Sequence, residues 1–152
     1  MPDKATLAKA RKDKREGKSA STQAGEFVRE EIEHIREGKH GARSTKQAIA
    51  IGLSKARRAG VKLAVPRKGT TSKDVREQAK RDIQRGKHPQ KTTNPTRSRA
   101  MKSTLKKMGH KVASSAALSK QAHASAMRRT AAERSASAKK AAAVRTKRPH
   151  RG

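Results

Sequence analysis

The sequence predicts a mainly α-helical protein. We expect one or two small helical hairpins, a disordered basic leader at the N-terminus and an Ala/Lys/Arg-rich tail at the C-terminus. The 152 residues carry 41 Lys and Arg against 12 Asp and Glu, a formal net charge of +29. Only 31% of residues are hydrophobic, and Phe27 is the one Phe, Tyr or Trp. Such a chain has little material for a deep core, and its charge favours a polyanionic partner.

The leader, residues 1–21, is expected to be disordered, because a short helix over 4–16 would have nothing apolar to anchor it. The first predicted helix covers about residues 23–37, where Val28, Ile32 and Ile35 recur at helical spacing. Gly38 ends this helix at a position that favours glycine. Five Glu residues make this helix acidic.

A second helix is predicted after Ser44, which forms a capping box with Gln47. Ile49, Leu53 and Ala56 give it an apolar stripe, and basic residues occupy its last turns, where cations complement the helix dipole. Residues 22–63 therefore predict a helical hairpin with an apolar seam between an acidic and a basic helix.

The same plan is expected again, in degenerate form, after a linker at residues 64–72. The segment 75–88 resembles 28–40, so residues 73–112 predict a second hairpin. Residues 113–152 form an Ala/Ser/Lys/Arg-rich, conditionally helical tail. Its end, residues 130–152, is expected to be disordered alone and helical on an anion.

The stretch GEFVREEIEHIREGKHGARSTKQAIAIGLSKARRAGVKL, residues 25–63, resembles a family of small, very basic bacterial proteins that share a domain of uncharacterised function. The resemblance extends through residues 106–142. It implies no particular activity. The string SAKKAAAVRTKR, residues 137–148, is similar in composition to the tails of linker histones and bacterial histone-like proteins.

Charge points to nucleic acid as the partner. Lys and Arg that neutralise phosphates release counterions, which drives binding. Solubility alone needs a net charge of only about 2–8 in a small domain. Residues 1–82 hold 22 basic and 11 acidic residues, whereas residues 83–152 hold 19 basic residues and one acid. The candidate phosphate contacts are Lys46, Lys55, Arg57, Arg58, Lys62, Arg67, Lys68, Lys102, Lys106, Lys107, Lys111, Arg128, Arg129, Lys139, Lys140, Lys147 and Arg148.

Duplex DNA is favoured over RNA, because single strands are usually gripped by aromatic stacking and Phe27 is expected in the core. Lys46 and Gln47 would reach base edges in a helix-turn-helix, but the connection 38–43 is long for that motif. We therefore expect non-specific binding, as an accessory nucleoid-associated or histone-like protein. The alternatives are an RNA- or ribosome-associated basic protein, and a protein-interaction module that uses the acidic helix 23–37.

Other classes of function find little support in the sequence. The absence of Cys excludes disulfide frameworks, Cys-based zinc sites and thiol catalysis. The six His residues lack ligand spacing, so we expect no metal, no cofactor and no catalytic residue, and hence neither an enzyme nor a small-molecule substrate. Without a long apolar run or a signal peptide, the protein is expected to be cytoplasmic, at the nucleoid, with no membrane partner.

Overall fold

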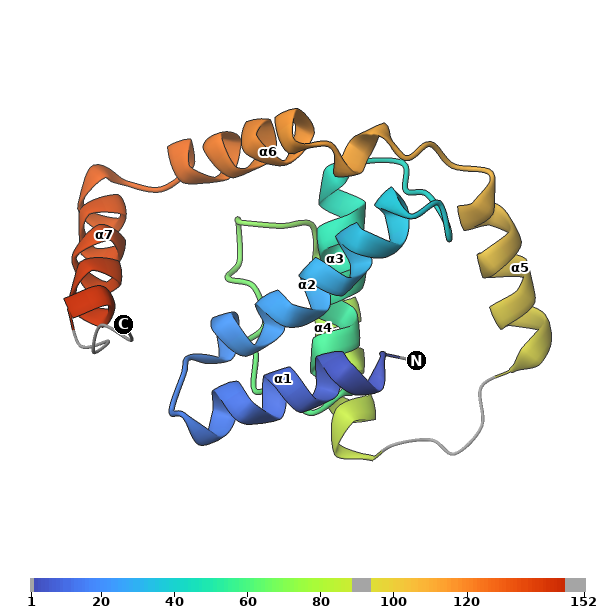
Figure 1. Ribbon diagram of the computed structural model, residues 1–152, viewed down its shortest axis with the longest axis horizontal. Helices are drawn as coiled ribbons and strands as arrows, with labels where there is room; N and C mark the ends of the chain where they lie inside the picture. Colours follow the sequence, from blue (N-terminus) through green and yellow to red (C-terminus); the bar gives the residue numbers. More distant parts are fainter. Residues whose placement is uncertain (1, 89–93, 147–152) are drawn as a thin grey trace, which may run out of the picture. The chain divides into compact units, whose positions relative to one another are not determined.

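The expected helical fold is confirmed by the computed structural model, which describes residues 2–88 and 94–146 (Figure 1). Contacts divide the chain into two compact units, Met1–Ser114 and Ser115–Gly152. The described residues contain no strand; Lys68 and Thr71 form one isolated β-bridge. The helices are α1 (Lys4–Arg15), α2 (Ala20–Arg36), α3 (Thr45–Arg58), α4 (Lys73–Lys87), α5 (Pro95–Lys106), α6 (Ser115–Met127) and α7 (Ala131–Thr146), with a 3-10 turn, η1, at Lys111–Ala113.

The predicted hairpin of residues 22–63 corresponds to α2 and α3, which pack against each other. Phe27 and Ile35 of α2 are fully buried, as the apolar spacing predicts. Gly52 of α3 lies so close to α2 that a Cβ there would come within 2.7 Å of Val28 Cα. The small residue therefore sets the close approach of the two helices.

The N-terminus of α3 is capped nearly as the sequence predicts. Ser44 Oγ accepts a hydrogen bond from the Gln47 backbone N–H, at 3.2 Å. The Gln47 side chain, however, accepts from the Arg43 N–H at 2.6 Å, one residue before the N-cap. The reciprocal contact of a capping box is thus shifted by one residue and fixes the end of the preceding turn.

Residues 4–15, expected in the disordered leader, form α1 and pack on α2. Ala10 is buried with Phe27, and Leu7 packs against the same core cluster. Asp3, just before α1, donates its backbone N–H to Glu30 Oε2 at 3.1 Å. The helix is therefore anchored by a small apolar contact and a polar one, which apolar periodicity does not reveal.

The expected second hairpin, residues 73–112, is also arranged differently. Helix α4 packs on α3, and a Cβ at Gly86 would come within 2.3 Å of the Arg57 carbonyl oxygen. The end of α5 instead meets the turn after α2: the Gly41 N–H donates to the Leu105 carbonyl at 2.8 Å. Helices α4 and α5 therefore each contact the first hairpin, at different places.

The second unit holds α6 and α7. Thr130 and Glu133 form a capping box, with reciprocal hydrogen bonds of 2.9 and 3.2 Å. Helix α6 buries no residue, so alanine helix propensity rather than a core accounts for it. Residues 131–146, expected to be helical only on an anion, are helical here as α7. Within the described residues, no helix has the length and apolar character to span a membrane.

Candidate nucleic-acid interface

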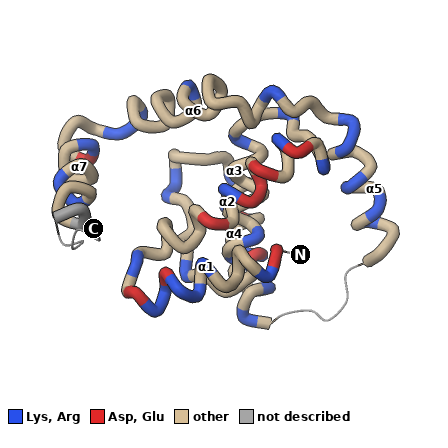
Figure 2. Tube along the Cα trace, in the orientation of Figure 1, with Lys and Arg blue, Asp and Glu red and all other residues tan. Residues whose placement is uncertain are grey.

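Buried carboxylates of the first unit are held by partners inside that unit. Asp82, 1% exposed, accepts hydrogen bonds from Ser54 Oγ at 2.5 Å and Gln78 Nε2 at 3.2 Å. Asp13, also buried, accepts from Lys18 Nζ at 2.6 Å. Figure 2 shows Lys and Arg along the described chain, whereas Asp and Glu are most numerous in α2, with three more in α4. Burial thus withdraws four of the twelve Asp and Glu residues from the surface.

Lys55, one of the candidate phosphate contacts, lies inside this network. Its Nζ is 3.1 Å from Glu30 Oε1 and 2.7 Å from Glu31 Oε2, and its side chain is 16% exposed. Burial favours the neutral amine, but the proximity of Glu31 and then Glu30 outweighs it and raises the pKa of Lys55. We therefore remove Lys55 from the candidate interface: its charge is already neutralised by α2.

The neighbouring arginines at the end of α3 are partly engaged by the fold. Arg57 is half-buried, and its guanidinium donates to the Ala64 carbonyl at 3.4 Å. Arg58 is exposed, but its Nε donates to the Ser54 carbonyl at 3.3 Å and lies 3.6 Å from Asp82 Oδ1. The predicted basic end of this helix thus offers fewer free donors than its sequence suggests.

The other described candidates in the first unit are exposed and come from separate segments. Lys46 is on the first turn of α3. Lys62, Arg67 and Lys68 lie in the connection between α3 and α4. Others lie on α5 or shortly after it. They do not converge on one concave site. The exposed candidates of this unit are Lys46, Lys62, Arg67, Lys68, Lys102, Lys106, Lys107 and Lys111.

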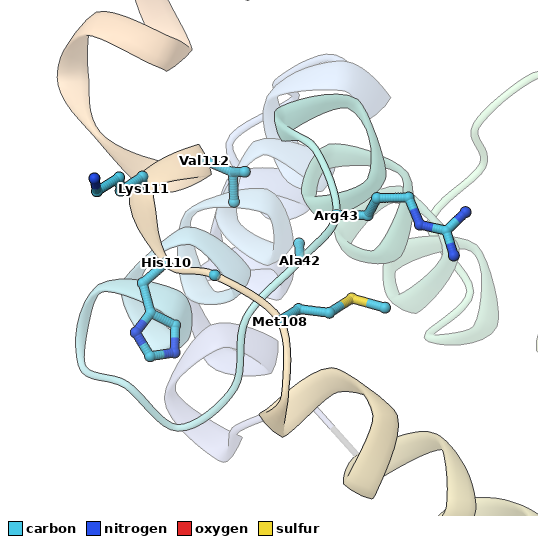
Figure 3. Close-up of a pocket in the computed structure, with 7 residues that line it drawn as sticks. Ala42, Arg43, Met108, His110, Lys111 and Val112 are labelled. Carbon is cyan, nitrogen blue, oxygen red and sulfur yellow. The ribbon is translucent and has the colours of Figure 1, made fainter.

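A shallow pocket of about 540 Å³ lies where the turn after α2 meets the segment after α5 (Figure 3). Arg43, His110 and Lys111 contribute to its lining, together with apolar residues such as Met108 and Val112. In Figure 3 the three basic side chains point away from one another. The pocket therefore does not gather them around a single phosphate.

The second unit presents cations from helices that bury very little. Arg128, Lys139 and Lys140 are exposed. Arg129 is exposed but donates to the Glu133 carbonyl at 2.8 Å and to the Ser137 hydroxyl, so it supports the turn between α6 and α7. The remaining two candidates, Lys147 and Arg148, lie outside the described residues.

A cluster of histidines and carboxylates lies at the end of α2. Glu31, His34 and His40 each place one potential ligand atom within 4.8 Å of the others. His34 lies inside α2, and His40 follows the end of that helix, although the sequence alone led us to expect no metal site at the histidines. The missed signal is the Glu31-x-x-His34 spacing, which puts both side chains on one helix face.

Comparison with known proteins adds one likeness. Residues 11–69, less than half of the chain, match a family of unknown function (DUF6496). The matched segment contains the last five residues of α1 and all of α2 and α3, and so includes the hairpin and its buried ion pairs. Neither the curated proteins nor the solved structures contain a significant match. The similarity thus supports an uncharacterised domain in the first unit.

Proposed function

We propose that this protein binds duplex DNA non-specifically through phosphate contacts, as an accessory nucleoid-associated or histone-like protein. The observation that carries the proposal is the separation of charge. A chain with a net charge of +29 buries several of its few carboxylates and leaves most candidate cations exposed. Exposed Lys and Arg are the groups that displace condensed counterions from DNA.

The choice of duplex over single strands rests on the aromatic residue. Phe27 is 0% exposed, and the sequence has no Tyr or Trp. Proteins that grip single strands commonly stack bases on exposed aromatic rings. Phosphate contact is the mode that the remaining side chains support, and the phosphate backbone of a duplex supplies it.

The acidic helix is a weaker candidate for a protein-binding surface. Glu30 and Glu31 of α2 are 4% and 1% exposed, and both contact Lys55. A partner that docked on these carboxylates would have to displace an internal ion pair. The acidic character of α2 therefore supports the fold first.

Salt dependence provides the test. We expect the affinity for a random-sequence duplex to fall steeply with salt, with log K decreasing by about 0.9 per log unit of salt for each phosphate contact. Fluorescence anisotropy at several salt concentrations, with nuclease-treated protein, measures this slope. A preference for one duplex sequence that random DNA fails to compete away would contradict the proposal, as would tighter binding to tRNA than to duplex DNA.

Matched triple variants distinguish contacts from bulk charge. Replacing Arg128, Lys139 and Lys140 with Gln should lower the slope by up to about 2.7, or 0.9 for each lost contact. Replacing Lys4, Lys9 and Arg11, which are also exposed and lie on α1, removes the same charge from residues outside the proposed interface. Equal effects of the two triple variants would show that only net charge matters.

A further inference from the structure

We propose that Glu31, His34 and His40 bind one Zn²⁺ ion. The two imidazoles and the carboxylate belong to the ligand types that zinc takes most often, and three such ligands with a fourth position for water form a common zinc site. Their potential ligand atoms lie within 4.8 Å of one another. The site is independent of the DNA contacts proposed above.

Local backbone geometry brings the three residues together. Glu31 and His34 are separated by three positions on α2 and so lie on one face. The helix then ends in a Schellman motif: Lys39 N–H donates to the His34 carbonyl at 3.0 Å, and Gly38 has a φ of 72°. This reversal turns His40 back over the face that carries Glu31.

The hydrogen bond of His40 leaves two acceptors facing each other. Its Nδ1 lies 3.2 Å from the Gly41 carbonyl oxygen, which requires the proton on Nδ1. In a neutral ring the Nε2 lone pair then points at Glu31 Oε1, 3.4 Å away. That oxygen is buried and accepts no hydrogen bond from the described residues. A cation between the two atoms, either a proton or a metal ion, resolves this juxtaposition.

The spacing suits a metal ion better than a proton. Zinc bonds of about 2.0–2.2 Å place tetrahedral ligand atoms about 3.3–3.5 Å apart. The 3.4 Å between His40 Nε2 and Glu31 Oε1 matches this separation, and it is long for a hydrogen bond between charged groups. His34 and His40 keep 15% and 17% side-chain exposure, so an ion can enter from solvent.

The charged groups around the site have a net negative charge, which favours binding of a divalent cation. Asp3, Glu30 and Glu31 supply three negative charges, and Lys55 supplies one positive charge. With neutral histidines the cluster has a net charge of −2, which one Zn²⁺ ion neutralises. Glu31 Oε2 faces Lys55 Nζ at 2.7 Å, so Oε1 remains for the metal without loss of the ion pair.

A second carboxylate supports the histidine ligand on α2. Asp3 Oδ2 lies 3.2 Å from His34 Nε2. A carboxylate that accepts from one imidazole nitrogen leaves the lone pair on the other, and zinc-binding histidines are commonly oriented this way. The ion would thereby connect α2, the residue preceding α1 and the turn that receives α5.

Titration with ZnCl₂ tests the site on the full-length protein after removal of bound metal with a chelator and of nucleic acid with nuclease. We expect one tight site per chain by calorimetry, a rise in Tm with added Zn²⁺, and the strong visible bands of tetrahedral cobalt when Co²⁺ replaces Zn²⁺. His40→Gln should weaken binding at least tenfold and abolish the rise in Tm.

The sequence provides a matched control, because the tripeptide Gly-Lys-His occurs at both 38–40 and 86–88. His88 is exposed and belongs to no metal-ligand cluster among the described residues. His88→Gln should therefore bind Zn²⁺ like the wild type. The proposal is overturned if both variants bind Zn²⁺ equally, or if His40→Gln lowers the Tm of the metal-free protein while Zn²⁺ shifts no Tm, which would identify a protonated His40–Glu31 pair.

Discussion

Lys55 shows how strongly the register of one helix decides the role of a charged residue. It lies in the last turns of α3, where a lysine complements the helix dipole whether it faces solvent or protein. Only the packing of α2 determines that its ammonium lies between Glu30 and Glu31. Sequence spacing identifies the basic cluster, but the face that each cation occupies follows from the tertiary crossing.

We expect Lys55→Met to destabilise the first unit by about 3–5 kcal/mol, because two nearly buried carboxylates lose their counter-charge. Urea unfolding followed by circular dichroism measures the change. Lys46→Met, at an exposed position of the same helix, should stay within about 0.5 kcal/mol of the wild type. Equal stability of the two variants would contradict an internal role for Lys55.

The same ion pair predicts how stability depends on pH. Burial acts to raise the pKa of Glu30, but hydrogen bonds from Thr6, the Asp3 N–H and Lys55 outweigh it and lower that pKa below 4.5. The stabilisation by Glu30 is thus present above pH 4.5 and is lost as the pH falls through the lowered value.

Lys55 has a pKa raised above 10.5, so its stabilisation is present below pH 10.5 and is lost as the pH rises through the raised value. Urea midpoints measured from pH 3 to 11 should therefore form a plateau with losses at both ends. Lys55→Met should remove much of the alkaline loss, and an unchanged alkaline limb would argue against the pair.

At the scale of elements, the close crossing of α2 and α3 depends on Gly52, which has no side chain. A Cβ at Gly52 would lie 2.7 Å from Val28 Cα, which is backbone and cannot rotate away. Gly52→Ala should therefore cost about 1–3 kcal/mol by overpacking. Thermal or urea unfolding measures this loss.

Gly25, on α2, is the matched control, because a Cβ there would meet nothing within 4 Å. Gly25→Ala should stabilise the protein by about 0.4–1 kcal/mol through the unfolded chain. If both variants gain stability, the two helices do not cross as closely as the structure has them.

How far the sequence predicts each element depends on its anchors. The hairpin follows from large residues such as Phe27 and Ile35 at helical spacing, and both are buried. Helix α1 is held by Ala10, Leu7 and the contact of Asp3 with Glu30. Small and polar anchors give no periodic signal, so a leader without an obvious apolar face appears disordered when read from sequence alone.

The metal-ligand cluster escapes sequence reasoning for a related reason. Glu31 and His34 are recognisable as a pair on one helix face, but His40 joins them only through the chain reversal at Gly38. Asp3, which contacts His34, lies just before α1 and so comes from a different segment of the chain. A pattern confined to one helix therefore shows two of the three proposed ligands, and the fold supplies the third.

At the scale of the whole molecule, the two units divide the chain between a folded and a weakly packed part. The first unit contains the described buried residues and the acidic network, whereas α6 in the second unit buries none. The charge distribution does not follow this division, because the acid-poor part of the chain begins at residue 83, inside α4 of the first unit. Charge composition alone therefore does not locate the boundary between the two units.

The hydrogen bonds that join the ends of α2 and α3 to the segment after α5 have a consequence for unfolding. Arg36 Nε donates to the Ala113 carbonyl and Thr45 Oγ1 to the Val112 carbonyl, across 77 and 67 residues of chain. Closing so long a loop costs chain entropy, which returns when the contacts break. Breaking these contacts together with the Gly41–Leu105 hydrogen bond therefore frees α5, whereas α4 remains packed on α3. We expect α5 to detach before the helices α1–α4 unfold.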